Sequence, residues 1–198
     1  MIIKIINKIR YLIKLLNKNF IYYFFLTKKY KINKWHAFNN LNNRLYKKEI
    51  ISFCNEKNFK TVLDYGCGFG DIIKELKAKK KFAYDNDPKI KKISKKLFNQ
   101  NLINFINKKK LNSVKKKLDC VLFINFLHDY NPEKVKEIIY PFKNSKFILL
   151  DAIKPGVKGF KYFHNYNFMK KKYKIKKKTF IDEPDRNFFI LEKYENRK

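Results

Sequence analysis

The feature that most constrains this chain is the ten-residue segment 62–71, with the sequence VLDYGCGFGD. A short apolar run with β propensity precedes an acidic residue and then glycines at alternate positions, Gly66, Gly68 and Gly70. Glycine reaches left-handed backbone angles without steric cost, and because it has no Cβ it lets a ligand lie against the main chain. The segment therefore predicts a strand, a tight turn and a helix start that together form a nucleotide-type pocket.

The spacing of these glycines excludes two common nucleotide-binding loops. A phosphate-binding loop would end in Gly-Lys-Ser or Gly-Lys-Thr, and a dinucleotide-binding loop would place its third glycine where Asp71 stands. The pattern Asp-x-Gly-x-Gly-x-Gly instead resembles the first motif of the class I S-adenosylmethionine-dependent methyltransferases, and an ordinary strand-to-helix turn is the alternative. The resemblance implies S-adenosylmethionine as cofactor, bound by Asp64, Gly66, Cys67, Gly68 and Gly70.

A second apolar run, residues 81–85, also ends in an acidic residue, twenty-one positions after the acid of the first run. In a βαβ unit the intervening helix fills this gap, so Asp85 reaches the carboxyl end of the neighbouring parallel strand. A carboxylate there can accept hydrogen bonds from both hydroxyls of a ribose. Asp85 therefore resembles the ribose-binding acid of the family, with Asn86 and Asp87 on the adenine side. Asp87 is also expected to cap a helix that begins at Pro88.

The rest of the chain alternates short apolar runs with helical patterns. Strands are expected near 61–65, 81–85, 102–106, 118–124 and 146–151, and helices near 44–54, 71–79, 88–99 and 132–141. Two further β-rich runs, 173–180 and 187–194, flank the turn sequence IDEPDR and predict an antiparallel hairpin. The prediction is an α/β, Rossmann-like class I methyltransferase fold, with a mostly parallel seven-stranded sheet, a C-terminal antiparallel hairpin and helices on both faces.

Length and cysteine usage limit the organisation of the chain. Its 198 residues fit one α/β domain, which we assign to residues 49–198, behind a basic amphipathic helical extension over residues 1–48. The three cysteines are scattered without a Cys-x-x-Cys pair, which argues against a disulfide framework and a zinc site. We therefore expect a cytoplasmic protein with no metal centre.

The formal net charge of +31 favours anionic partners, nucleic acid among them. The excess is almost wholly lysine, whereas bidentate recognition of phosphates and bases favours arginine. The abundance of lysine, asparagine, isoleucine, phenylalanine and tyrosine together is the bias expected from an AT-rich genome. RNA methylation is therefore kept as an alternative function and not as the first interpretation.

The extension carries the sharpest charge pattern, because residues 1–48 include no acid. Its apolar residues repeat at helical spacing, at Ile2, Ile5, Ile6, Ile9, Leu12, Ile13, Leu16 and Phe20. The apolar run 20–26 is far shorter than the roughly 20 residues that span a bilayer. Three interpretations stay open: a helix lying on the anionic inner face of the membrane, a cover over the acceptor pocket, or packing against the domain or a second subunit.

The end of the fourth strand is where the family resemblance places the meeting of acceptor and methyl group. Here it carries the cluster Asn125, Phe126, Leu127, His128 and Asp129. His128 is the candidate catalytic base or acceptor-orienting group, because imidazole titrates near neutrality; satisfying the turn before the helix at 132 is its alternative role. Asn125 and Phe126 are assigned to the cofactor, as is Asn107, which stands where the family often has an acid that contacts adenine.

The same cluster limits the class of molecule that can be the methyl acceptor. It lacks the Asn/Asp-Pro-Pro-Tyr and Pro-Cys patterns of enzymes that methylate nucleic-acid bases. The stretch 34–48, which includes Trp35 and His36, is similar to one that precedes the glycine motif in bacterial methyltransferases of surface-polysaccharide pathways. The predicted function is methyl transfer to a small molecule or glycan precursor. A non-catalytic scaffold that binds the cofactor, or nothing, is a further alternative.

Overall fold

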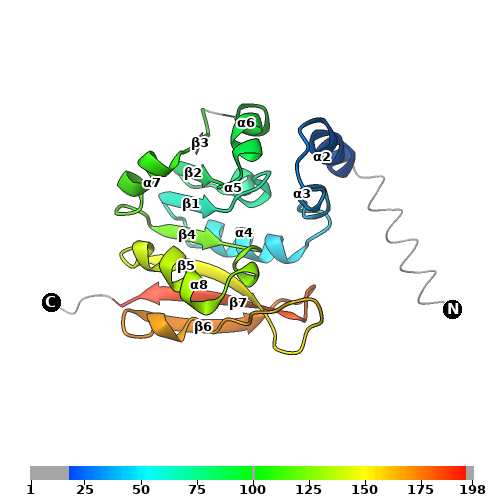
Figure 1. Ribbon diagram of the computed structural model, residues 1–198. Helices are drawn as coiled ribbons and strands as arrows, with labels where there is room; N and C mark the ends of the chain where they lie inside the picture. Colours follow the sequence, from blue (N-terminus) through cyan, green and yellow to red (C-terminus); the bar gives the residue numbers. More distant parts are fainter. Residues whose placement is uncertain (1–17, 100, 195–198) are drawn as a thin grey trace.

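The computed structural model describes residues 18–99 and 101–194. Its centre is a seven-stranded sheet in the order β3-β2-β1-β4-β5-β7-β6 (Figure 1). The strands are β1 Thr61–Tyr65, β2 Lys80–Tyr84, β3 Ile103–Phe105, β4 Cys120–Phe123, β5 Phe147–Ile153, β6 Tyr173–Thr179 and β7 Arg186–Lys193. The first five strands run parallel, and β7 is antiparallel to both β5 and β6. This arrangement confirms the predicted mostly parallel sheet with a C-terminal hairpin.

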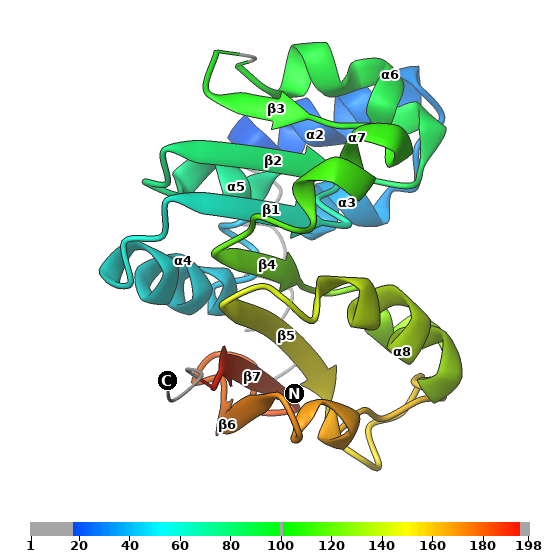
Figure 2. The same cartoon turned by 90° about the vertical axis from the view of Figure 1, so that its left-hand side faces the viewer.

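Helices cover both faces of the sheet, as predicted (Figure 2). They are α4 Tyr46–Glu56, α5 Asp71–Glu75 and α6 Pro88–Leu97 on one face, and α7 Lys108–Val114 and α8 Pro132–Ile139 on the other. Successive strand residues point to opposite faces, so Val62 and Leu122 pack under α4–α6 while Leu63 and Val121 pack under α7 and α8. Burial on both sides explains why the central strand β4 is apolar along its whole length.

The described part of the extension packs against the first of these faces. Helix α2, Lys18–Lys29, and the short helix α3, Trp35–Phe38, share one apolar core with α4–α6. Tyr23 of α2 is buried, its ring lies 4.8 Å from the ring of Phe69, and its hydroxyl donates to Asp71 Oδ1 over 3.0 Å. The predicted amphipathic positions 2–16 lie outside the described residues.

The proposed division of the chain at residue 48 falls inside α4, and it stays a prediction. Within the part of the chain that the structure describes, no helix combines the length and the apolar character needed to cross a membrane.

Several element ends differ from the sequence-based expectation. Helix α5 ends at Glu75 and not near residue 79, because Leu76 takes an extended conformation. Helix α8 gives way at Ile139 to the 3-10 turn Tyr140–Phe142, since Pro141 has no amide hydrogen to continue the α-helix. Helix α7 was not predicted from the sequence.

Candidate active site

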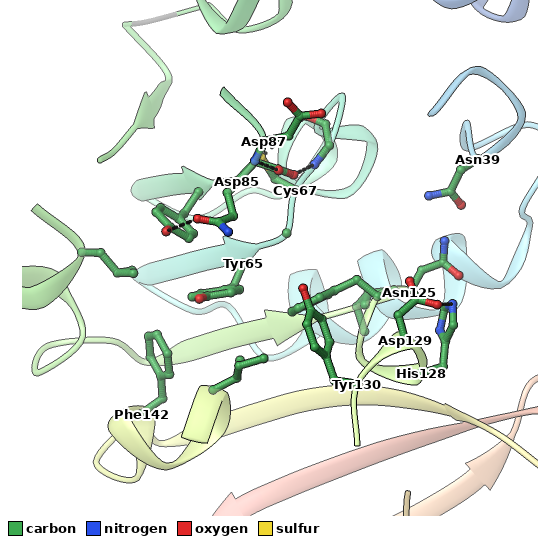
Figure 3. A pocket seen from close by; sticks show the side chains of 18 of the residues that line it. Asn39, Tyr65, Cys67, Asp85, Asp87, Asn125, His128, Asp129, Tyr130 and Phe142 are labelled. Carbon is green, nitrogen blue, oxygen red and sulfur yellow. Dashed lines mark hydrogen bonds and ion pairs between the residues drawn. The ribbon is translucent and has the colours of Figure 1, made fainter. Parts of the chain in front are cut away.

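A cleft of about 750 Å³ opens at the carboxyl ends of β1, β2 and β4 (Figure 3). The chain leaves β1 toward β2 on one side and reaches β4 on the other, so the cleft lies where the strand order reverses. Open α/β sheets bind their ligands at such a point. The glycine turn after β1 forms one wall, residues 124–130 after β4 form the opposite wall, and α3 closes one end.

The glycine turn leaves no room for side chains at the two glycines that line the cleft. Gly66 has φ +78°, and a Cβ there would lie 2.9 Å from Cδ1 of Phe126. Gly68 has φ +51°, and a Cβ there would lie 2.9 Å from Nδ1 of His36. The bare main chain therefore admits Phe126 from one wall and His36 from α3, and both glycines line the cleft together with Cys67. Burial raises the pKa of the Cys67 thiol well above its usual range, so the thiol is not a nucleophile at neutral pH.

Asp85 ties the glycine turn to the end of β2. Its Oδ2 accepts a hydrogen bond from the Gly68 amide over 2.8 Å, and its Oδ1 accepts one from the Asp87 amide over 2.9 Å. A carboxylate has about four acceptor sites, so about two of those of Asp85, which lines the cleft, stay unused. Asn86 and Asp87 also line the cleft, and Asp87 accepts from the Lys89 amide over 2.8 Å, which confirms that it caps α6.

Three predicted cofactor residues, Asp64, Gly70 and Asn107, do not line the cleft. Asp64 is buried beneath the turn, where burial raises the pKa of its carboxyl to about 7 while Lys47 opposes that rise. Asn107 caps α7, its Oδ1 accepting from the Lys110 amide over 2.9 Å. Gly70 faces the ring of Phe98. The assignment of all three to the cofactor stays a prediction.

Asn125 occupies an unusual position at the end of β4. Its φ is +66°, a left-handed conformation that costs a residue with a Cβ about 1–3 kcal/mol unless the surroundings hold it. The backbone amide of Asn125 donates to Asp151 Oδ1 over 2.7 Å, which helps to hold that conformation. The residue is only 8% exposed, and neither Oδ1 nor Nδ2 of its side chain has a partner among the described residues. A buried unpaired amide is costly, so this group is suited to hydrogen-bond a ligand.

His128 stands on the same wall, in the 3-10 turn Leu127–Asp129. Its Nε2 lies 3.7 Å from Asp129 Oδ1, and its ring meets the ring of Phe160 edge to face at 5.1 Å. Burial lowers the pKa of His128 although nearby acids oppose the change, so the imidazole is neutral at pH 7 and able to accept a proton. Asn131, and not His128, caps the following helix, accepting from the Lys134 amide over 2.8 Å.

Lys47 is a lining residue that sequence reasoning missed. It is buried in α4, where its Nζ donates to the carbonyl of Asn39 and lies 3.3 Å from Asp71 Oδ2. Burial lowers its pKa, and the carboxylate of Asp71 opposes that change. Because Tyr23 of α2 donates to the same carboxylate, Asp71 joins the N-terminal helices to the cleft wall. In a chain so rich in lysine, no sequence signal separates this lysine from the exposed ones.

A second cavity of about 470 Å³ adjoins the cleft. The two share Trp35, Asn125, His128 and Asp129 in their walls. The other walls come from the loop after β5 and from the turn of the β6–β7 hairpin. Tyr166, in the segment after β5, is buried, and its hydroxyl donates to the carbonyl of Asp151 over 2.7 Å.

Solved structures share this architecture at low sequence identity. A magnesium protoporphyrin IX methyltransferase of Synechocystis PCC 6803 with bound SAH matches with a TM-score of 0.59 and 15% identity, over 76% of this chain and 82% of the other. A type 11 methyltransferase of Sulfolobus solfataricus, itself assigned only putatively, matches with a TM-score of 0.58 and 17% identity, over 76% of this chain and 94% of the other. An O-methyltransferase family protein of Burkholderia thailandensis matches with a TM-score of 0.59 and 12% identity, over 85% of this chain and 63% of the other.

These similarities show that the chain has the class I methyltransferase fold. The cleft at the carboxyl ends of β1, β2 and β4 lies where folds of this doubly wound kind bind their ligands. No family model matches the sequence, and a search of curated proteins finds no match.

Proposed function

We propose that this protein is an enzyme that transfers a methyl group from S-adenosylmethionine to a small molecule or glycan precursor. The observation that carries the proposal is the carboxylate of Asp85, fixed by the Gly68 amide at the end of β2 with acceptor capacity to spare. Structural neighbours with bound SAM and SAH support the choice of cofactor. The proposal therefore rests on a site and not on the fold alone.

The residues present fit this cofactor. Asp85 can accept from the two ribose hydroxyls, because about two acceptor sites of the carboxylate are unused. The main chain at Gly66 and Gly68 lines the cleft, and a ligand beside it would also meet the rings of Phe126 and His36. Asn125 offers an unpaired amide at the opposite wall, and Lys47 lies where it could pair with a carboxylate. Asn86, Cys67 and Phe126 complete the proposed cofactor contacts.

When bound, the cofactor supplies an electrophilic methyl group on a sulfonium, so the protein's tasks are alignment and exclusion of water. Trp35, Phe126 and Tyr130 bring aromatic surface to the cleft, which favours water exclusion. His128, neutral and placed between the cleft and the second cavity, is suited to take a proton from an acceptor. We propose it as the general base.

The first test is cofactor binding with Asp85→Ala. We expect S-adenosylhomocysteine to stabilise the wild-type protein by about 2.7 kcal/mol at 100 times its dissociation constant. Asp85→Ala should lose most of that stabilisation, because the ribose would lose its acceptor. Asp182→Ala is the matched control, since Asp182 is an exposed aspartate outside both cavities. Thermal unfolding at increasing concentrations of S-adenosylhomocysteine measures the stabilisation of all three proteins.

A folded wild-type sample that S-adenosylhomocysteine does not stabilise would refute the proposal and favour the non-catalytic scaffold. Equal stabilisation of wild type and Asp85→Ala would support cofactor binding but show that Asp85 does not contribute to it.

RNA methylation is tested on the same samples, because an RNA acceptor requires strong binding that weakens steeply with salt. The second cavity argues against RNA, since no lysine is among its described lining residues.

We also propose that the protein associates peripherally with the anionic inner face of the membrane. The outer face of α2 supports this, because Ile21, Tyr22 and Phe25 are about half exposed there and Lys28 and Lys29 follow them. Ile21→Ser is expected to reduce co-sedimentation with phosphatidylglycerol vesicles several-fold. Ile181→Ser, which removes an equally apolar and 84% exposed side chain elsewhere, should not. Equal losses would contradict a specific role of α2.

A further inference from the structure

The second cavity differs in charge from the rest of the molecule. The chain carries 48 basic residues against 17 acidic ones, and almost all of the basic ones are lysines. Yet the cavity is lined by three acids, Asp129, Glu183 and Asp185, and by two arginines, Arg44 and Arg186, with no lysine among its described lining residues. An acidic cavity in so basic a chain is the opposite of what composition alone would place there.

Both arginines are already paired. Nη1 of Arg44 lies 2.6 Å from Oε1 of Glu183, and the guanidinium of Arg186 is bound by the buried carboxylate of Asp151. Among the described residues, the ion-pair contact of Asp129 is with the neutral His128, at 3.7 Å, and the Asp129 side chain is 76% exposed. Asp185 is also exposed. The cavity therefore presents an uncompensated negative charge.

Two aromatic side chains add to this preference. The guanidinium of Arg44 occupies one face of the Trp35 ring, 4.9 Å from its centroid, which leaves the other face for a ligand, and Phe160 lines the same cavity beside His128. Aromatic rings attract cations through their negative faces, and more strongly where water is partly excluded. Acid and aromatic together form a surface suited to an ammonium group.

Asn125 gives independent evidence of a ligand here. It is more than nine-tenths buried, it lines both cavities, and its Oδ1 and Nδ2 have no partner in the described part of the chain. In Figure 3 it lies next to His128 and Asp129 on the wall that the two cavities share. An amide oxygen at this place can accept a hydrogen bond from a nitrogen or oxygen of a bound acceptor.

Resting on the proposed function, we infer that the second cavity binds the methyl acceptor and that this acceptor is a small molecule carrying a primary or secondary amine. The amine arrives as an ammonium, attracted by Asp129 and Asp185. After loss of a proton to His128 its nitrogen lone pair forms the bond to the methyl carbon. The electron pair of the broken carbon–sulfur bond stays on sulfur, which becomes a thioether, and the proton on His128 passes to solvent.

Trp35 allows a test that does not depend on the natural acceptor. It is the single tryptophan of the chain and lines both this cavity and the cleft, so once S-adenosylhomocysteine fills the cleft its fluorescence reports further binding in this cavity. Benzylamine, benzyl alcohol and benzoate present the same ring with a positive, neutral and negative group. In the presence of saturating S-adenosylhomocysteine, we expect benzylamine to half-saturate the fluorescence change at an at least about tenfold lower concentration than either analogue.

The double variant Asp129→Asn/Asp185→Asn should remove the advantage of benzylamine, whereas Asp182→Asn, an exposed acid outside the cavity, should keep it. Equal or tighter binding of benzyl alcohol or benzoate, an advantage that survives in the double variant, or no saturable binding of benzylamine would each overturn the inference. Calorimetry with S-adenosylhomocysteine on the same samples separates the two proposals. If the cofactor analogue binds and the amine preference is absent, only the amine inference fails; if the analogue itself does not bind, the proposed function fails.

Discussion

Gly70→Ala is expected to destabilise the fold by about 2–5 kcal/mol, which for a chain of marginal stability approaches complete unfolding. Two effects add. Gly70 has φ +75°, a conformation that strains any residue with a Cβ, and that Cβ would lie 2.1 Å from Cε1 of Phe98. The ring of Phe98 is buried among the helices on that face and has little room to move. Urea unfolding followed by circular dichroism measures the loss.

Gly156→Ala is the matched control for this prediction. Gly156 has φ +88°, but a Cβ there would meet nothing within 4 Å. It should therefore cost only the backbone strain, about 1–2 kcal/mol. The double variant Gly70→Ala/Phe98→Leu should lose less stability than the sum of the two single variants, because the shorter leucine side chain no longer clashes with the added Cβ. Equal costs at Gly70 and Gly156 would show that Phe98 does not press on the turn.

This contact shows what the sequence could and could not predict about the site. The alternate glycines predicted a tight turn with left-handed backbone angles, and that prediction is confirmed at all three positions. They also predicted a main chain open to a ligand. At all three positions a side chain distant in the sequence takes the space instead, at Gly70 that of Phe98, which lies 28 positions away just after α6. No local pattern could have indicated such a pairing.

The fold was largely predictable because its strands are buried on both faces and therefore read as continuous apolar runs. Helix α7 escaped prediction for a related reason. It is a seven-residue helix in which only Leu111 and Val114 are buried, so it carries too few apolar residues to show a helical period. The lysines around them look the same as those of a loop.

The second cavity was not predictable, because its walls come from segments far apart in the sequence. Glu183 and Asp185 stand in the stretch IDEPDR, which the sequence identified only as a turn. Folding of the hairpin brings this turn opposite Arg44 and Trp35 of the N-terminal region. Local periodicity carries no information on contacts between such distant segments. The motif residues around Asp85, in contrast, lie at the ends of two adjacent strands and could be placed by topology alone.

Arg186→Met is expected to cost about 3–5 kcal/mol of stability, because it would leave the charge of Asp151 buried without a partner. The side chains of Arg186 and Asp151 are 5% and 1% exposed and form an ion pair. Asp151 also accepts a hydrogen bond from the backbone amide of Asn125 over 2.7 Å. The loss of the ion pair should therefore also disturb the wall shared by the two cavities. Denaturant unfolding measures the stability, and binding of S-adenosylhomocysteine measures the effect on the site.

Arg44→Met is the matched control, because Arg44 lines the same cavity and pairs with Glu183, yet both side chains are about a quarter exposed. Water screens such a pair, and its loss should cost about 0–1 kcal/mol. The double variant Arg186→Met/Asp151→Asn distinguishes buried charge from lost packing. Asparagine is neutral and can still accept from the Asn125 amide, so this variant should be more stable than Arg186→Met alone. If it is not more stable, lost packing of the Arg186 side chain explains the loss of stability, and the unpaired charge of Asp151 does not.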